Sequence, residues 1–215
     1  MIESVFHNIP DSKILENLLR IHAPDKLLLA LDCTYNTGKM WKSFNFKDTG
    51  VKLDTMDIDP NSKAFFIEDF MEMPSIPDNK YDFLVFDPPH LPGVSEGSSK
   101  IYAKEYGIIG PTKGREKENV SGMFRPFLLQ AKRVLKKDGI ILVKICDLIQ
   151  GRKYQWQHVD LINIARDLDI VACDMAIKSR SGSIISSKWK NQYHLRKSHS
   201  YWIVLRLKGC QRKRE

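Results

Sequence analysis

The chain has 215 residues, of which 42% are apolar, and a net charge of +8. This length fits one domain, and the apolar content suffices for a hydrophobic core, which excludes a wholly disordered chain. No apolar run approaches the roughly 18 residues that a membrane span needs, and residues 1–10 lack the pattern of a signal peptide. The four cysteines lie far apart, without the clustered ligands of a zinc site. We therefore expect a cytoplasmic protein without a metal site.

The secondary structure is predicted from apolar periodicity and turn residues. Residues 11–22 have apolar side chains at helical spacing, with Asp11 or Ser12 as the cap. Residues 26–33 form a continuous apolar run, which is typical of a strand buried on both faces. Further along the chain we expect strands at 51–58, 64–67, 81–86, 140–146, 170–177 and 201–207, and helices at 40–46, 122–137 and 158–168.

The order of these elements predicts an α/β fold with a mostly parallel, seven-stranded sheet. No helix separates the last two strands, so they should pair antiparallel as a hairpin at one edge of the sheet. In such sheets ligands bind at the carboxyl ends of the strands. The acidic residues predicted at those ends are Asp32, Asp57, Asp69 and Asp87.

The positive charge is concentrated in the C-terminal fifth of the chain. Residues 175–215 contain 11 Lys or Arg and one acid, a net charge of +10, whereas residues 1–174 contain 23 Lys or Arg and 25 acids, a net charge of −2. Such asymmetry is typical of proteins that bind polyanions. A solvated basic edge would show the same pattern.

The first two strand ends favour a nucleoside ligand without a phosphate. Asp57, followed by Ile58, stands where a doubly wound fold holds a ribose diol. The turn at 32–38 has a single glycine, Gly38, and lacks the spacing that admits a pyrophosphate, which argues against a dinucleotide. S-adenosylmethionine is a ligand that fits a less open turn. At the third strand end, Asp69 could accept the adenine amino hydrogens and Phe70 could offer a flat apolar face.

The fourth strand ends in Phe86-Asp87-Pro88-Pro89-His90, the strongest motif in the sequence. Two prolines force an extended, rigid backbone. We expect this backbone to turn the Asp87 carboxylate and the Pro88 carbonyl toward one point. Two converging acceptors suit an amino group, whose lone pair they would direct at an electrophile. His90 would stack on the ring that carries the amine.

These motifs resemble those of class I S-adenosylmethionine-dependent amino-methyltransferases, which act on adenine N6 or cytosine N4. Asp87-Pro88-Pro89-His90 is similar to the family's catalytic motif, and Leu31–Gly38 to its cofactor motif. The segments Val143–Asp147 and Arg196–Tyr201 resemble the corresponding segments of a subgroup of small phage or bacterial DNA methyltransferases. The family's usual stacking aromatic is His90 here, and Asn36 replaces a glycine that many relatives have.

The resemblance covers roughly residues 27–208 and implies a Rossmann-like methyltransferase fold, S-adenosylmethionine as cofactor, and a nucleic-acid substrate, with DNA favoured. The Asp at the head of the motif favours adenine N6 over cytosine N4 in this family. We expect a single methyltransferase domain over residues 1–215. Its catalytic candidates are Asp87, Pro88, Pro89 and His90. Its cofactor-binding candidates are Asp32, Thr34, Tyr35, Gly38, Asp57, Ile58, Asp69 and Phe70. An RNA substrate, cytosine N4, and a non-catalytic nucleic-acid-binding subunit remain alternatives.

Two segments are candidates for contact with the nucleic acid, because a base must be flipped out or single-stranded to reach such a site. Residues 91–121 are predicted to be a mobile insert or lid, and 178–200 a basic substrate-binding loop, followed by a basic tail at 208–215. The predicted nucleic-acid contacts are Lys178, Arg180, Lys188, Trp189, Lys190, Arg196 and Lys197. Lys144 either lines the site or marks a strand end. His7, His22 and His158 have no evident acid–base partners, so we expect them at the surface.

Overall fold

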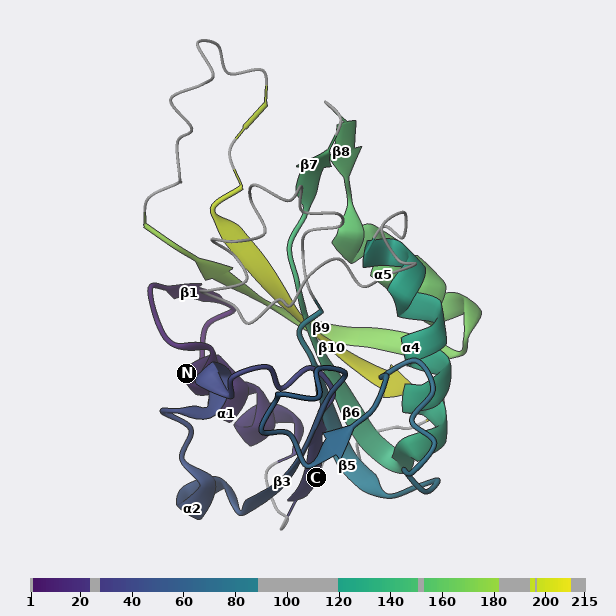
Figure 1. The fold of residues 1–215 in the computed structure, drawn as a ribbon. Helices are drawn as coiled ribbons and strands as arrows, with labels where there is room; N and C mark the ends of the chain where they lie inside the picture. The colour runs from purple at the N-terminus through teal and green to yellow at the C-terminus, as the bar shows by residue number, and fades with distance from the viewer. Residues whose placement is uncertain are drawn as a thin grey trace.

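A computed structural model describes residues 2–23, 28–88, 120–150, 153–181, 194–195 and 197–209 (Figure 1). Several residues singled out from the sequence lie outside these ranges: Pro89 and His90 of the catalytic motif, nearly all of the insert at 91–121, the basic residues Lys188, Lys190 and Arg196 with Trp189, and most of the tail at 208–215.

The centre of the fold is an eight-stranded sheet. From one edge to the other its strands are β1 (Val5–His7), β9 (Ile170–Ser179), β10 (His199–Leu207), β6 (Leu135–Ile145), β5 (Tyr81–Phe86), β2 (Leu28–Asp32), β3 (Val51–Asp57) and β4 (Phe66–Ile67). All neighbouring strands pair in parallel except β10, which is antiparallel to both β6 and β9. The predicted mostly parallel sheet with an antiparallel hairpin is confirmed.

The hairpin does not form the edge of the sheet, contrary to the prediction. Residues 5–7 pair with the outer side of β9, in the register Val5 with Ile177. This three-residue strand is too short to show an apolar period among its polar neighbours. The basic loop is also shorter than predicted, because β9 continues to Ser179 and β10 begins at His199.

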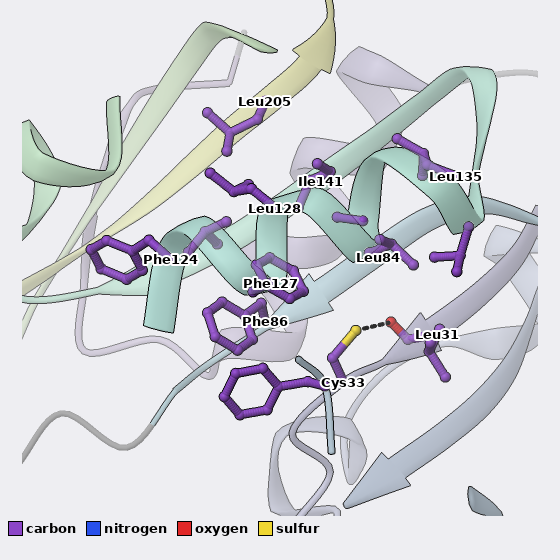
Figure 2. Packing of buried hydrophobic residues seen from close by; sticks show 14 of the residues in the cluster. Leu31, Cys33, Leu84, Phe86, Phe124, Phe127, Leu128, Leu135, Ile141 and Leu205 are labelled. Atoms are coloured by element: carbon purple, nitrogen blue, oxygen red, sulfur yellow. Dashed lines mark hydrogen bonds between the residues drawn. The ribbon is translucent and has the colours of Figure 1, made fainter. Parts of the chain in front are cut away.

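Helices cover both faces of the sheet (Figure 1). Successive residues of β5 point to opposite faces, as a strand's period of two requires. Phe83 and Val85 pack in one cluster with α1 (Asp11–His22), whereas Leu84 and Phe86 pack in the other with α4 (Val120–Val134) and α5 (Gln157–Asp167). In the second cluster the Phe86 and Phe127 rings stack with their centroids 3.8 Å apart (Figure 2). The central strands are therefore buried on both faces, as predicted.

Three local predictions were wrong. The helix expected at 40–46 is a short 3₁₀ turn, η1 (Lys39–Trp41), followed by α2 (Phe46–Thr49), because the Asn45 side chain accepts a hydrogen bond from Asp48 N and starts a new helix. Neither predicted residue caps α1, whose N-cap is Pro10. Strand β6 begins at Leu135 rather than at residue 140.

Gly139 explains why β6 can start early. A Cβ at this position would lie 2.9 Å from the carbonyl oxygen of Asp82 and 2.6 Å from the Leu135 side chain. Glycine therefore lets β6 approach β5 closely where their register shifts, between Tyr81 and Phe83. Gly139 thus lies within a strand, two residues beyond the end expected for the helix at 122–137.

A second, small sheet was not predicted. It is the hairpin of β7 (Leu148–Gln150) and β8 (Lys153–Gln155), which lies between β6 and α5 in the sequence and projects beyond the end of β6 (Figure 1). Within the described ranges, no helix is both long and apolar enough to cross a membrane.

Candidate active site at the carboxyl edge of the sheet

Three carboxylates gather where β2, β3 and β5 end, as the sequence predicted. Asp32 is 2% exposed and accepts hydrogen bonds from Thr34 N at 2.9 Å and from Trp41 Nε1 at 2.6 Å. Burial chiefly, together with the nearby charges of Asp87 and Asp57, raises the pKa of Asp32 to about 7, although the two hydrogen bonds act to lower it. The edge therefore concentrates negative charge that would favour a cationic ligand.

The turn after β2 is held to both neighbouring strands by backbone hydrogen bonds. Cys33 N donates to Val85 O of β5, and Tyr35 N donates to Met56 O of β3, each at 2.9 Å. Gly38 closes the turn with φ +67°, and a Cβ there would lie 2.6 Å from Cζ of Tyr35. This left-handed conformation and close contact require glycine.

Asp57 fixes the same turn from the other side. One carboxylate oxygen accepts from Asn36 N at 2.6 Å, and the other accepts from Asp59 N at 2.9 Å. A carboxylate has about four acceptor sites, so both oxygens retain capacity for hydroxyl donors. Ile58, the next residue, is 49% exposed and offers an apolar surface beside that carboxylate.

Asp69 and Phe70 follow β4, but the structure gives Phe70 a role other than the one predicted. Asp69 Oδ1 accepts from Met71 N at 2.9 Å, so this carboxylate orders its own turn. The Phe70 ring is 9% exposed and lies edge-on to Phe86, with centroids 4.9 Å apart. Because the core takes up most of this ring, Phe70 supports the Asp69 turn and offers little surface for an adenine to stack on.

Asp87 is held through both its backbone and its side chain. Its backbone N–H donates to Thr34 Oγ1 at 2.9 Å, which joins the end of β5 to the turn after β2. Its Oδ2 lies 2.9 Å from Nζ of Lys144, on β6. Pro88, the next residue, is buried.

Lys144 is a site residue that the sequence left open. Its ammonium also lies 3.3 Å from Asp11 Oδ2, and that same oxygen is 2.7 Å from Nζ of Lys178. Burial alone would lower the pKa of Lys144, but the carboxylates of Asp87 and Asp11 raise it above its ordinary value. The Asp87–Lys144–Asp11–Lys178 chain thus has alternating charges and keeps Lys144 protonated.

The predicted nucleic-acid residues that the structure describes fall into different environments. Lys178 forms an ion pair with Asp11 and has a side chain only 15% exposed. It is therefore part of the Asp87–Lys144–Asp11–Lys178 chain and not a free phosphate contact. Arg180 is exposed. The Nζ of Lys197 lies over the ring of Tyr154, 4.3 Å from its centroid.

The histidines predicted to be unpartnered surface residues each have a partner. His22 Nε2 lies 2.8 Å from Asp174, and His7 contacts the Ser179 hydroxyl. His158 Nδ1 lies 2.7 Å from Oδ1 of Asp147, whose side chain is fully buried. No sequence signal marked the His158–Asp147 pair, because the unpredicted β7–β8 hairpin separates its members.

Comparison with known proteins identifies the fold. No protein-family model and no curated protein matches the sequence. Among solved structures, an S-adenosylmethionine-dependent methyltransferase from Leishmania major superposes with a TM-score of 0.55 at 14% identity, over 91% of this chain and 71% of that one. The 1,6-didemethyltoxoflavin-N1-methyltransferase from Burkholderia thailandensis, solved with S-adenosylhomocysteine, gives 0.55 at 12% identity, over 94% and 80%.

A TehB-like methyltransferase from Corynebacterium glutamicum gives a TM-score of 0.50 at 13% identity, over 94% of this chain and 89% of that one. Together with the strand order, these likenesses show that the chain has the Rossmann-like fold of class I methyltransferases. At such low sequence identity, these likenesses indicate the fold and not the substrate.

Proposed function

We propose that this chain is an S-adenosylmethionine-dependent methyltransferase that acts on an exocyclic base amine of nucleic acid, namely adenine N6 in DNA. The observation that carries the proposal is the fixed Asp87 carboxylate, held at the end of β5 by Thr34 and Lys144 beside the acidic edge formed with Asp32 and Asp57. The fold of the structural neighbours and the basic C-terminal fifth of the chain support it.

The residues at the strand ends fit the proposed cofactor. S-adenosylmethionine supplies an electrophilic methyl group on a sulfonium, and its positive charge suits an edge where ionisation of Asp32 is opposed by burial and by neighbouring carboxylates. Asp57 would hold the ribose hydroxyls with Ile58 against the nucleoside, and Asp69 would accept the adenine amino hydrogens. The turn formed by Asp32, Thr34, Tyr35 and Gly38 would hold the methionine end.

Asp87 would act by orienting the target amine. Its Oδ2 is already held by Lys144, but the carboxylate keeps acceptor sites for an N–H donor. With the Pro88 carbonyl as second acceptor, both amine hydrogens would be bound and the nitrogen lone pair directed at the methyl group. Pro89 would keep this backbone extended, and His90 would stack on the base.

Lys144 is a positioning residue in this mechanism. Its ammonium lies between the carboxylates of Asp87 and Asp11 and would hold the Asp87 carboxylate in place at the end of β5. An ionised carboxylate is an acceptor only, so it cannot present a hydrogen that would bind the amine lone pair.

The test is calorimetric titration of S-adenosylmethionine into the purified chain, followed by tritiated methyl transfer to unmodified DNA and RNA. We expect binding and transfer to DNA, with label in N6-methyladenine after digestion. Asp87→Ala should abolish transfer and leave cofactor affinity nearly unchanged. The matched control is Asp167→Ala, because Asp167 is 60% exposed and lies on α5.

Each result has a defined meaning. Label recovered from RNA, or in cytosine, would contradict the proposed polymer or base while supporting the chemistry. Failure to bind S-adenosylmethionine would contradict the proposed enzymatic activity and favour a non-catalytic nucleic-acid-binding subunit. Loss of cofactor affinity in a folded Asp87→Ala variant would contradict the division of roles between Asp87 and the cofactor turn.

A further inference from the structure

A pair of stacked rings, one exposed and one partly buried, lies beyond the end of β6, and we call it the aromatic platform. It consists of Tyr154, on β8, and Trp156, the N-cap residue of α5. The ring centroids are 4.6 Å apart and the planes are inclined by 18°. Trp156 is 50% exposed, whereas Trp41 and Trp202 are 5% and 0% exposed. Of the three tryptophans that the structure describes, Trp156 is therefore the one that presents its ring to solvent.

A cation accompanies the platform. The Nζ of Lys197 lies 4.3 Å from the Tyr154 centroid and 5.4 Å from the Trp156 centroid. His194 meets Tyr154 edge-on, with centroids 5.6 Å apart. Both come from the basic segment before β10, so the platform joins the β7–β8 hairpin to the region of greatest positive charge.

The platform is anchored to the active-site edge by a further row of contacts. The Trp156 ring is 6.1 Å from His158, which is 4.6 Å from Tyr201. The buried Asp147 accepts from the His158 ring and from Tyr201 Oη. Tyr201 pairs with Ile145 on β6, one position beyond Lys144, the residue that holds Asp87. The rings thus lead from the platform to the strand ends where the target amine would lie.

We propose that the aromatic platform stacks a base of single-stranded DNA next to the target nucleotide, with Lys197 beside the strand's phosphates; this inference rests on the proposed function. Rings with exposed faces bind bases of any sequence, and interleaved cations neutralise the backbone. Two stacked rings held rigidly lose little conformational freedom on binding. The platform would therefore keep a flipped or unpaired strand at the carboxyl edge without specifying its sequence.

The test is fluorescence anisotropy with a fluorescein-labelled, single-stranded 20-nucleotide DNA of mixed sequence, titrated with the full chain at several salt concentrations. We expect Trp156→Ala to weaken binding by about 5- to 150-fold, the effect of losing one base–aromatic stack. Trp156→Phe, which keeps a ring, should stay within about threefold of the unsubstituted chain. The matched control is Phe65→Ala, because Phe65 is 76% exposed and adjoins β4 at the opposite edge of the sheet.

Salt dependence separates stacking from charge. Trp156→Ala should shift the plot of log Kd against log salt without changing its slope, whereas Lys197→Gln should reduce the slope by about 0.7. Circular dichroism and thermal melting of each variant show that it folds.

The proposal is overturned if Trp156→Ala binds DNA as well as Phe65→Ala, or if Trp156→Leu, apolar but without a ring, binds like the unsubstituted chain. It is also overturned if only an RNA of the same sequence is bound. Titration of S-adenosylmethionine into the same variants tests the proposed function separately. Loss of cofactor binding in all of them, with Trp156-dependent DNA binding intact, would contradict the proposed enzymatic function. It would still support the proposal that the aromatic platform binds DNA.

Discussion

The Lys144 ammonium lies 2.9 Å from an Asp87 carboxylate oxygen, and the two side chains are only 17% and 21% exposed. An ion pair so enclosed is costly to break, because the remaining charge is left poorly solvated. Asp87 is therefore a carboxylate whose position depends on a lysine of the neighbouring strand β6.

We predict that Asp87 and Lys144 are energetically coupled. In a double-mutant cycle with Asp87→Ala and Lys144→Met, the double variant should lose about 1–3 kcal/mol less free energy of unfolding than the two single variants lose in sum. Chemical denaturation of the four proteins measures it. The Asp82–Lys136 pair has a similar distance of 2.9 Å but a lysine that is 46% exposed, so its cycle should give less than about 1 kcal/mol. Equal couplings would contradict the argument from burial.

Gly38→Ala should destabilise the fold by about 1–3 kcal/mol and weaken cofactor binding. The new Cβ would meet the Tyr35 ring, and φ +67° is unfavourable for alanine. Gly209→Ala is the control, since Gly209 has φ +87° but no atom within 4 Å of the added Cβ. The difference between the two variants in thermal or urea unfolding gives the cost of the contact alone. A Gly38→Ala variant no less stable than Gly209→Ala would show that Tyr35 moves aside freely.

The raised pKa of Asp32 should make stability fall as pH rises. Because the folded pKa of about 7 exceeds the unfolded value of 3.8, the folded state binds more protons between these values. The contribution to stability is complete below pH 3.8 and is lost as pH rises through 7. In urea unfolding, Asp32→Asn should remove a slope of up to about 1.4 kcal/mol per pH unit between pH 4.5 and 6.5. Parallel curves for the two proteins would refute the shift.

The same titration should control cofactor affinity. A cationic ligand beside Asp32 favours the ionised carboxylate, so S-adenosylmethionine should bind more tightly at pH 8 than at pH 6. Calorimetry in two buffers of different ionisation enthalpy would detect the accompanying proton release near pH 6. A pH-independent affinity would place the positive charge of the ligand away from Asp32.

Asp147→Ala should cost about 1–3 kcal/mol of unfolding free energy. The carboxylate accepts from the His158 ring at 2.7 Å and from Tyr201 Oη at 3.4 Å, and its side chain is fully buried. Truncation would therefore leave both donors without their hydrogen-bond acceptor. Asp167→Ala is again the control, because its partner Arg125 is 51% exposed and 3.5 Å away. We expect a change within about 0.5 kcal/mol there. Similar losses in both variants would mean that water replaces the Asp147 contacts.

The sequence predicted best what depends on local patterns. Residues 81–86 form β5 as predicted, since a continuous apolar run bounded by turn residues is characteristic of a strand buried on both faces. The acids that follow β2, β3 and β5 meet because parallel strands end at one edge. Asp57 and Asp87 could be assigned to that edge by this rule alone, because Asp57 lies at the end of a predicted strand and Asp87 directly follows one.

What could not be predicted depends on contacts between distant parts of the chain. Lys144 and Asp87 are 57 positions apart, and Asp11 meets Lys178 across 167 positions. The residues that flank Asp11 suggested a helix cap, yet its carboxylate accepts from two lysines and from Trp202 Nε1 instead. Likewise, the short strand β1 and the β7–β8 hairpin have no distinctive apolar periodicity. Because the hairpin was not predicted, no pattern in the sequence indicated the aromatic platform that includes Trp156.

Strand β10 is inserted between β6 and β9, although it follows both of them in the sequence. During translation, the growing chain therefore exposes two unpaired strand edges until residue 207 has emerged from the ribosome. Trp202, at the middle of this strand, then contacts Asp11 across 191 positions. Such distant pairing slows folding and makes the nascent chain prone to aggregate, so the yield of native protein should depend on chaperones that cover strand edges during synthesis.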